Sequence, residues 1–399
     1  MTTSLNQHRS LMRLLLSRIR FGSVVVSWSN GTVDVFSGSE SGQVAVMIVN
    51  DEARLMRSLL EKGSLGFAAA YIDQAWDTPD LPVLLEVASR SIDARQNQRR
   101  GQTLMALSRK VWDARPHRAW ESPIEEIGVH YNLGNDFYGA WLDESMTYSS
   151  AIFNTPGETL QDAQNSKYQR LCALLELRPG DRVLEIGSGW GGFAHYAATH
   201  YDVEITGVTL STEMATYAQK RLADAGLSHR TEFKVQDFRD ETGMYDKVVS
   251  VEMIESISAD QWPDLFSTIH RVLLPGGIVA MQAITIESRF YQQLTQREEF
   301  IKTYIFPGGD LPTHALLQQL ADEAHLVWTQ DSFHGLDYAE TLSRWASSFA
   351  AAWDRISVGS AVLDDRFRRM WSYYFAYCEA GFRTGRLDGI QFSAMRPSS

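Results

Sequence analysis

The chain has 399 residues, of which 44% are hydrophobic and 22% are charged, which is the balance of an ordinary globular protein. This length exceeds what one compact core usually holds, so we expect two domains. No run approaches the roughly 18 apolar residues of a membrane-spanning helix, and the N-terminus lacks the features of a secretory signal peptide. Two cysteines are too few for a disulfide framework and suit a reducing cytoplasm. No Cys/His cluster has metal-ligand spacing, so we expect no metal site.

The formal net charge of −12 is unevenly distributed along the chain. Residues 1–120 contain 15 Lys and Arg against 11 Asp and Glu, which leaves 22 basic and 38 acidic residues in the remainder. The acidic excess of the larger part opposes binding to phosphates, so we expect no nucleic-acid partner. A basic N-terminal part suits an anionic partner surface, although chance also explains an excess of four charges.

Residues 1–95 predict a small α+β domain for membrane docking or dimerisation. The stretch 8–20 has the pattern of a basic amphipathic helix, which either packs on its own domain, the preferred interpretation, or lies on a membrane. Asn30 and Gly31 separate two β-rich runs and predict a hairpin. Residues 96–125 predict a basic linker, whose arginines and tryptophans suit either a solvated connector or a phospholipid headgroup layer.

Residues 126–399 predict a second, α/β domain. Strand and helix patterns alternate from Asp181 onward, which favours a parallel sheet with helices on both faces. The segment 285–325 interrupts this alternation with a long helical stretch of the kind that often forms a lid. The expected strands are 182–187, 203–209, 231–236, 246–252, 277–284, 326–330 and 390–396.

The segment VLEIGSGWGG ends a predicted strand with Gly187, Ser188 and Gly189 and then enters a helix. Glycine permits a tight turn and the close approach of the backbone to a ligand. Glu185 lies in the strand ahead of the turn, and the spacing differs from the G-x-G-x-x-G of dinucleotide-binding folds.

Two later segments end at the same predicted edge of the sheet. One strand ends in Gln236 and Asp237, which are placed to meet an adenine, and another ends in Thr209, Leu210 and Ser211. Ligands of open α/β sheets bind at the carboxyl ends of the strands, so these residues and the glycine turn should surround one crevice. The segments resemble class I S-adenosylmethionine (SAM) methyltransferases, which implies SAM as the cofactor. Many of those enzymes have an acidic residue for the ribose where this chain has Thr209, Leu210 and Ser211.

Seven segments then occur in a characteristic order: HYNLGNDFYGAWLDESMTYSSAIF, VLEIGSGWGGFAHYAA, GVTLSTE, QDFRD, SVEMIESI, FIKTYIFPGGDLPT and YCEAGFRTG. Together they resemble the cyclopropane fatty-acyl-phospholipid synthase family over residues 125–396. The resemblance implies a seven-stranded Rossmann-like sheet with a helical lid insertion and a small N-terminal α+β domain. It also implies a cytoplasmic enzyme, peripherally associated with the inner membrane, that methylates the double bond of an unsaturated phospholipid. A homodimer is a candidate assembly.

The residue types suit this chemistry. Attack of an alkene on a sulfonium methyl group leaves a carbocation, which aromatic faces stabilise without trapping it as water would. A base must then remove a proton so that a ring closes. The candidate aromatic residues are Tyr131, Phe137, Tyr148, Phe153, Tyr304 and Phe306.

The resemblance implies that the base is a bound bicarbonate, held by the peptide of Ser150 and by the side chains of Glu255, Gln282 and Tyr338. The chain departs from the family pattern at two of these positions, because Ser150 replaces a cysteine and Gln282 replaces a histidine. Glutamine can donate a hydrogen bond to an anion but cannot carry a charge. The anion site is therefore expected to be altered but present.

The resemblance also implies that Tyr148 and Ser149 contact SAM. Cyclopropane formation is the first hypothesis. The alternative is a methyl- or methylene-branched acyl chain, if the altered anion site leads to loss of a different proton. A non-catalytic lipid- or SAM-binding protein and a methyltransferase of a soluble small molecule are further alternatives.

Overall fold

The computed structural model describes residues 2–96, 133–296 and 299–398. These residues form two compact units, which we describe separately. The first unit comprises the described residues of Met1–His130, Glu298–Ile305 and Trp353–Thr384, and the second those of Tyr131–Arg297, Phe306–Ala352 and Gly385–Ser399. The predicted linker 96–125 and the candidate residue Tyr131 fall outside the described residues, apart from residue 96.

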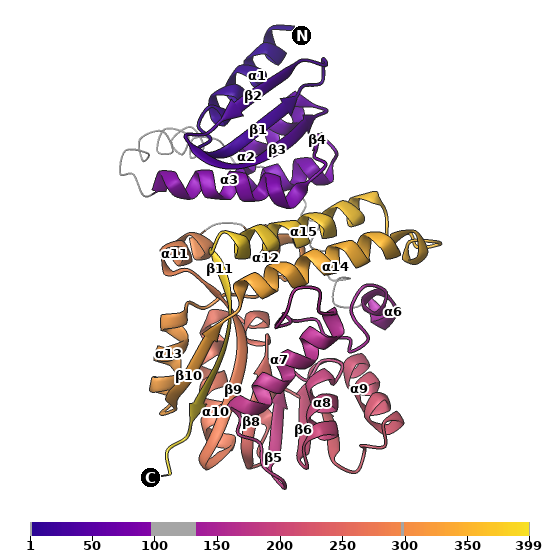
Figure 1. Cartoon of the computed structure of the whole chain (residues 1–399), viewed down its shortest axis with the longest axis vertical. Coiled ribbons are helices and arrows are strands. Elements are labelled where there is room, and N and C mark those ends of the chain that lie inside the picture. Colours follow the sequence, from indigo (N-terminus) through magenta and orange to yellow (C-terminus); the bar gives the residue numbers. More distant parts are fainter. Residues whose placement is uncertain (1, 97–132, 297–298, 399) are drawn as a thin grey trace. The chain divides into compact units, whose positions relative to one another are not determined.

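The first unit contains a four-stranded sheet in the order β2-β1-β3-β4 (Figure 1). Strand β1 pairs antiparallel with β2 across the Asn30-Gly31 turn, so the predicted hairpin is confirmed. Strand β3 runs parallel to β1 on its other side. The elements are α1 (Thr2–Leu16), β1 (Phe21–Ser27), β2 (Val33–Ser37), β3 (Glu40–Val49), α2 (Glu52–Ile72), β4 (Trp76–Asp77), α3 (Leu81–Gln96), α12 (Phe300–Tyr304) and α15 (Asp365–Arg383).

Helix α1 packs on its own domain, as the preferred interpretation of residues 8–20 predicts. Arg9 forms an ion pair with Glu52 of α2, and the Nε atom of Arg13 donates to Oδ2 of Asp34 in β2 at 2.6 Å. Both guanidinium groups also lie over the ring of Trp28, at 5.1 and 5.9 Å from its centroid. Two of the arginines that make this stretch basic are thus paired within the unit.

Helix α15 belongs to the first unit, although the sequence-based boundaries place it in the catalytic domain. Arg369 of α15 donates from Nε to the Tyr71 carbonyl at 2.7 Å and from Nη2 to the Trp76 carbonyl at 3.1 Å. Near the other end of α15, Arg90 of α3 donates to the Arg383 carbonyl at 2.9 Å. The N-terminal unit is therefore completed by a helix from late in the chain.

The second unit is built on a seven-stranded sheet in the order β10-β11-β9-β8-β5-β6-β7 (Figure 1). Strands β9, β8, β5, β6 and β7 are parallel, whereas β11 is antiparallel to both β9 and β10. All seven predicted strands are confirmed, with ends that differ by a few residues. The strands are β5 (Arg182–Ile186), β6 (Glu204–Thr209), β7 (Thr231–Val235), β8 (Tyr245–Val251), β9 (Leu273–Ile286), β10 (Val327–Phe333) and β11 (Leu387–Met395).

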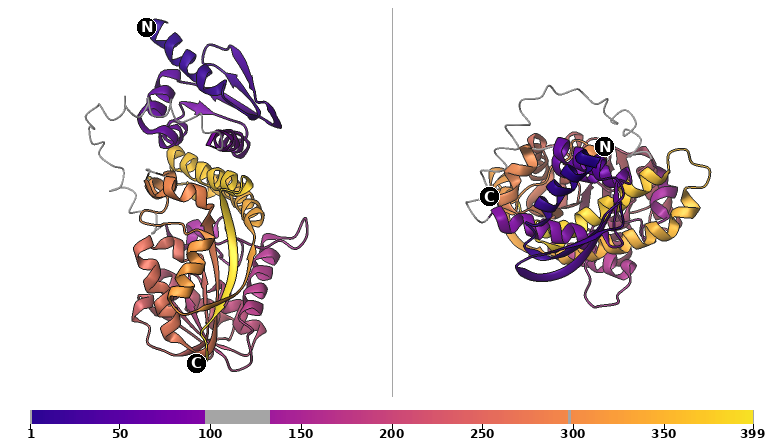
Figure 2. Two further views of the ribbon diagram at one scale, coloured as in Figure 1. Left: turned by 90° about the vertical axis from the view of Figure 1, so that its left-hand side faces the viewer. Right: turned by 90° about the horizontal axis from the view of Figure 1, so that it is seen from above.

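Helices cover both faces of this sheet, as the left view of Figure 2 shows with orange helices on one side and a magenta helix on the other. The helices are α6 (Gly134–Gly139), α7 (Leu160–Leu174), α8 (Gly192–His200), α9 (Thr212–Asp224), α10 (Trp262–Val272), α11 (Ser288–Gln296), α13 (His314–Glu323) and α14 (Gly335–Ile356), the last four residues of α14 belonging to the first unit. Short 3-10 turns are η2 (Phe238–Asp240), η3 (Ile254–Ser256) and η4 (Ala259–Gln261).

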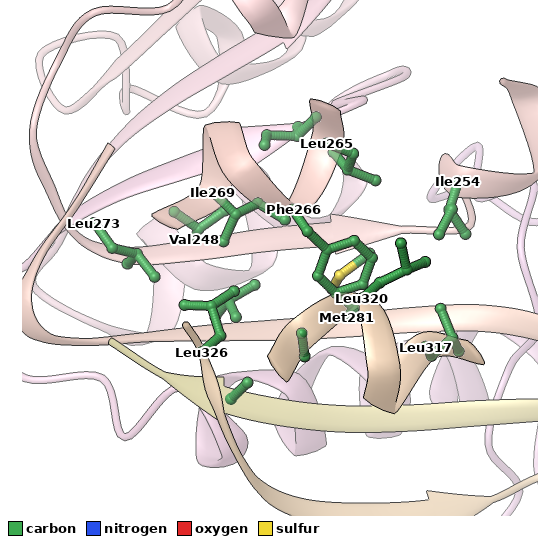
Figure 3. Close-up of a cluster of buried hydrophobic side chains, with 14 of the residues drawn as sticks. Val248, Ile254, Leu265, Phe266, Ile269, Leu273, Met281, Leu317, Leu320 and Leu326 are labelled. Atoms are coloured by element: carbon green, nitrogen blue, oxygen red, sulfur yellow. The ribbon is translucent and has the colours of Figure 1, made fainter. Parts of the chain in front are cut away.

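Successive residues of the central strands contribute to opposite cores. Val248 of β8 packs in the cluster with α10 and α13, whereas its neighbour Val249 packs with α7, α8 and α9. Figure 3 shows the first cluster, in which Phe266 of α10 and Leu320 of α13 gather around Met281 of β9. Strands buried on both faces are apolar at most positions, which explains the near-continuous hydrophobic runs of the sequence.

Candidate active site

The glycine turn follows β5 at the point where the sheet changes its winding direction, with β6 on one side of β5 and β8 on the other. The N–H groups of Gly187 and Ser188 both donate to the carbonyl of Val208, at 2.9 and 3.1 Å. Gly187 has a φ of 80°, and a Cβ atom there would lie 2.6 Å from Cγ of Met253. Gly189 has a φ of 50°, and a Cβ atom there would meet nothing within 4 Å. The first glycine is thus required by packing, and the second borders open space.

Two polar groups beside this turn fit a bound cofactor. The hydroxyl of Ser188 is buried and has no hydrogen-bond partner among the described residues, and the same holds for Oε2 of Glu185. Burial raises the pKa of Glu185 to about 8, against the lowering effect of the Ala194 N–H and Lys167. Open backbone and unpartnered polar atoms at the carboxyl end of a central strand are what SAM would require, so the residues present fit it.

The turn after β6 places Thr209, Leu210 and Ser211 at the same edge of the sheet. The Ser211 hydroxyl caps α9 by accepting from the Met214 N–H at 3.2 Å, and Leu210 is 75% exposed. Beyond β7, the Gln236 amide donates to Glu241 at 2.8 Å, and Asp237 is paired with Arg239 at 2.7 Å. The side chains of Ser211, Gln236 and Asp237 therefore have protein partners. Contact of SAM with these three residues, and with Thr209 and Leu210, stays a prediction.

The segment that contains Tyr148, Ser149 and Ser150 is fixed by hydrogen bonds from three directions. On the α14 side, the Ala151 N–H donates to Oγ1 of Thr341 at 3.1 Å, and the Phe153 N–H to Oδ1 of Asp337 at 3.2 Å. On the α7 side, the Gln164 amide donates to the Ser149 carbonyl at 2.9 Å and Lys167 to the Ser149 hydroxyl at 2.6 Å. Ser149 faces α7 through these bonds. The third direction is the sheet, where the Ser150 N–H donates to Glu252 and the Ser150 carbonyl accepts from Gln282 of β9.

The centre of the site is Glu252, which the sequence analysis did not single out. Its Oε1 atom accepts from the Ser150 N–H at 2.9 Å and from Nε2 of Gln282 at 2.7 Å. Its Oε2 atom accepts from the Tyr338 hydroxyl at 2.6 Å. Three of the four residues assigned to the anion site thus converge on one carboxylate. Burial raises the pKa of Glu252, while Lys167 and the three donors lower it.

Glu255 lies three residues further on, in η3. One of its oxygens accepts from the Ile284 N–H, and the other, Oε2, is buried without a partner among the described residues. Burial, followed by the nearby charge of Glu252, raises the pKa of Glu255 to about 8. At neutral pH Glu255 is therefore largely protonated beside the carboxyl group of Glu252.

A buried polar chain extends from Glu252 across the sheet. The Oε1 atom of Gln282 accepts from Nε2 of Gln391 at 2.8 Å, and the two residues lie opposite each other in β9 and β11. The ammonium group of Lys167, which is fully buried, lies 4.6 Å from the Tyr168 ring centroid. Burial lowers the pKa of Lys167 to about 7, while Glu252, Asp143 and Glu185 raise it.

Aromatic rings surround Tyr148, two residues before the peptide that binds Glu252. Its ring centroid lies 5.5 Å from those of Tyr138 and Trp141, 5.3 Å from Trp345 and 6.3 Å from Phe306. Phe137 packs against Trp141, at 6.1 Å. Phe153 instead lies under the guanidinium of Arg344, and Tyr304 belongs to the first unit.

The structure thus brings Ser150, Gln282 and Tyr338 together and places Glu255 beside them. Sequence reasoning missed Glu252, Lys167 and Gln391. Glu252 was detectable, because it is the first residue after a central strand, next to the strand that carries the glycine turn. Lys167 and Gln391 gave no comparable signal.

This sheet order, with the glycine turn at its switch point, is that of class I SAM-dependent methyltransferases, and the family match that follows shows the activity. Residues 119–392 match the family described as mycolic acid cyclopropane synthetase, and the chain belongs to this family.

Known relatives differ in their named products. The chain is 36% identical over 379 residues to "Tuberculostearic acid methyltransferase UfaA1" of Mycobacterium tuberculosis, a match that covers 92% of this chain and 87% of the relative. It is 33% identical over 329 residues to "Cyclopropane-fatty-acyl-phospholipid synthase" of Escherichia coli K12, covering 82% of each. Among solved structures, the cyclopropane synthase MmaA2 of Mycobacterium tuberculosis superposes with a TM-score of 0.62 at 28% identity, over 71% of this chain and 99% of that one.

None of the helices that the structure describes is long and apolar enough to cross a membrane. Among the same described residues, no group of three or more His, Cys, Asp or Glu residues is arranged to hold a metal ion.

Proposed function

We propose that the enzyme transfers a methyl group from SAM to the double bond of an unsaturated acyl chain in a phospholipid. The observation that carries this proposal is the pair of carboxyl groups, Glu252 and Glu255, next to a wall of aromatic rings around Tyr148. A weakly nucleophilic alkene needs a dry, aromatic site, and the cation that it forms needs a base. Relatives named for fatty-acyl-phospholipid and fatty-acid substrates support the same substrate class.

Different residues of the chain have different roles in this reaction. SAM, when bound, supplies an electrophilic methyl group. The aromatic rings of Tyr148 and Trp345, whose centroids are 5.3 Å apart, provide negative faces for the positive charge that develops on the acyl chain. The carboxylate of Glu252 lies where it can accept a proton, and Tyr338 and Gln282 hold it in position. The same rings exclude the water that would otherwise quench the cation.

Two products remain candidates. Cyclopropane formation is the first hypothesis, and the named activity of the Escherichia coli relative supports it. A branched acyl chain is the second, and the named methyltransferase activity of the relative that spans 92% of this chain supports it. The replacement of histidine by Gln282 also favours the second product, because the base is then held by an amide donor in place of an imidazole. Ser150 donates through its peptide N–H, which a cysteine would also provide.

The proposal extends to where the enzyme meets its substrate. A phospholipid acyl chain is reached from a membrane surface, so we propose a cytoplasmic enzyme that associates peripherally with the inner membrane. The basic N-terminal part supports contact with anionic headgroups. A homodimer also stays a prediction, which sedimentation equilibrium of the full chain would test.

Lipid analysis tests the proposed function. The chain is expressed in a host without an enzyme of this kind, and the extracted phospholipids are examined by mass spectrometry and proton NMR. A methylene-sized mass increment with upfield ring protons identifies a cyclopropane, and the same increment with vinyl or branched-methyl signals identifies the second product. No increment, together with no label transfer from methyl-labelled SAM to vesicles of unsaturated phospholipid, contradicts the proposal and favours a binding protein or a soluble substrate.

A further inference from the structure

The carboxylate of Glu252 occupies the donors that the family resemblance assigns to bicarbonate. That resemblance predicts an anion held by the Ser150 peptide and by the side chains of Gln282 and Tyr338. In the structure these three groups donate to Glu252 at 2.9, 2.7 and 2.6 Å. A hydroxyl and a peptide N–H each donate one hydrogen, so neither Tyr338 nor Ser150 has a second hydrogen for another anion. The residues present therefore do not fit bicarbonate.

The backbone of Glu252 points to the same conclusion. Its φ angle of 49° is in the left-handed region, which residues other than glycine rarely adopt. Such a conformation is strained and persists only where the surroundings fix it. Here the N–H of Glu252 is held by the Gln282 carbonyl at 2.8 Å, so that the side chain turns toward Ser150 and Tyr338. The strain serves to aim a carboxylate.

We propose that Glu252 is the built-in base of this enzyme and takes the place of a bound bicarbonate. This inference rests on the proposed function. In the reaction, the π electrons of the acyl double bond form the new bond to the methyl carbon, and the bond from that carbon to sulfur breaks. Glu252 then accepts one proton from the resulting cation, and the electrons of that C–H bond form either the third side of a cyclopropane or a new double bond. Neither outcome needs an oxidant or a reductant.

The charges around Glu252 suit a base. The ammonium group of Lys167, bound to Ser149 next to the Ser150 peptide, balances one negative charge in the buried site. Glu255 holds its proton at neutral pH, so that it adds no second negative charge beside Glu252. Tyr338 is buried, and the pKa of its hydroxyl is raised well above its usual value, so that it stays a donor. With these neighbours, Glu252 is the group of the site that can accept a proton.

Two variants of Glu252 separate an internal base from an external one. Glu252→Gln keeps the shape of the side chain but removes its basicity. Glu252→Gly vacates the anion site, and glycine accepts the local φ without strain. Each protein is assayed in buffer freed of carbon dioxide, with and without added bicarbonate, on vesicles of unsaturated phosphatidylglycerol and phosphatidylethanolamine with methyl-labelled SAM.

We expect wild-type activity to be unaffected by removal of bicarbonate. Glu252→Gln should lose activity by about 10²- to 10⁴-fold, the usual effect of losing a positioned base, with no recovery on addition of bicarbonate. Glu252→Gly should lose activity similarly but recover part of it with bicarbonate. SAM binding, measured by calorimetry, should be unchanged in both variants. Wild-type activity that requires bicarbonate, or a fully active Glu252→Gln variant, would overturn the proposal.

Glu176→Gly is the matched control. Glu176 is also a glutamate with a positive φ, of 51°, but it lies on the surface after α7 and its side chain is 58% exposed. This substitution relieves the same backbone strain, so it should change neither activity nor its response to bicarbonate. If Glu176→Gly reproduces the loss seen in Glu252→Gly, the loss comes from the backbone change and not from the missing carboxylate.

A readout without catalysis separates this inference from the proposed function. Binding of ¹³C-labelled bicarbonate is followed by NMR in the wild type and in Glu252→Gly. Binding to the variant alone supports the occupancy of the anion site by Glu252, and binding to the wild type overturns it. Wild-type protein that binds no bicarbonate and transfers no label to any unsaturated lipid contradicts the proposed function and leaves the occupancy of the site established.

Discussion

The Nζ atom of Lys167 donates a hydrogen bond of 2.6 Å to the Ser149 hydroxyl, which ties a fully buried ammonium group to the segment that carries the Ser150 peptide. A charge in such a place costs stability unless it is balanced. The acidic groups of Glu252, Asp143 and Glu185 raise the pKa of Lys167, whereas burial lowers it. The cost of this lysine is therefore measurable as a dependence of stability on pH.

Lys167→Met should flatten the rise of stability at alkaline pH. The pKa of Lys167 is lowered from 10.5 to about 7, so between these values the folded state binds fewer protons than the unfolded chain. The contribution of Lys167 to stability should therefore rise with pH from about 7 to 10.5, and its full cost is present below pH 7. Urea midpoints at several pH values measure the slope. Lys220→Met, at a lysine that is 75% exposed, is the control, and an unchanged slope in Lys167→Met would contradict the prediction.

Glu255→Gln should change the dependence of stability on pH between 4.5 and about 8. The pKa of Glu255 is raised from 4.5 to about 8, so the folded state binds more protons than the unfolded chain between these values. Wild-type stability should fall as pH rises through this window, and the variant should show a smaller fall, with the remainder contributed by Glu185. Turnover should slow while calorimetric SAM binding stays intact. Glu204→Gln, at an exposed position, should alter neither property.

Tyr338→Phe should shift the acid limb of the pH profile. The hydroxyl of Tyr338 donates to Glu252 at 2.6 Å and lowers the pKa of that carboxyl group. Its loss should move the limb of kcat/KM to higher pH and reduce activity by roughly 10- to 100-fold, as expected for a hydrogen bond to a charged group of about 1.5–3 kcal/mol. Tyr377→Phe removes a similar bond, to Glu299, from the other unit. A limb that stays in place would exclude Tyr338 from this role.

Gly189→Val should abolish SAM binding without unfolding the protein. A Cβ atom at Gly189 meets nothing within 4 Å, so the new side chain enters the space beside the glycine turn. We expect calorimetric affinity to fall by at least ~100-fold, equivalent to about 2.7 kcal/mol. Gly157→Val is matched, because Gly157 also has a positive φ and open space around it but lies away from the turn. If both variants lose binding equally, the effect is backbone strain.

Gln282→His should change the ratio of products. The Nε2 atom of Gln282 donates to both the Glu252 carboxylate and the Ser150 carbonyl, at 2.7 and 3.1 Å, while its Oε1 accepts from Gln391. A neutral imidazole has one donor and one acceptor, so one of these three bonds is lost and the carboxylate shifts. Proton NMR of the lipid products measures ring against vinyl or branched-methyl signals. Gln219→His on α9 is the control, and identical product ratios would count against this role of Gln282.

The sequence predicts the sheet well and the centre of the site incompletely. Each strand of the second unit is a short apolar run, so its existence follows from burial on both faces. Glu255 and Glu252 are both acidic residues in the segment SVEMIESI, and the family resemblance assigns only the first. Which carboxylate meets Ser150 depends on a left-handed backbone at Glu252, and no local pattern predicts that conformation.

The assignment of elements to the two units is also only partly predictable from the sequence. The domain boundary near residue 95 is predictable because the sequence becomes polar and basic there. The attachment of α15 to the first unit is not visible, because it depends on contacts such as that of Arg369 with the Tyr71 carbonyl, nearly 300 residues apart. Local periodicity predicts that α15 is a helix but carries no information on its partner.

The anchoring of the Ser150 segment by α14 has a consequence for synthesis of the chain. Ala151 reaches Thr341 across 190 residues, and the Ser150 carbonyl reaches Gln282 across 132. Contacts of such long sequence separation form late, because the chain must lose the entropy of closing a large loop before the contact can stabilise the fold. The ribosome releases β11, which carries Gln391, after every other strand of the sheet. A nascent chain can therefore complete the glycine turn early, but it cannot assemble the proton acceptor until the whole sheet has emerged.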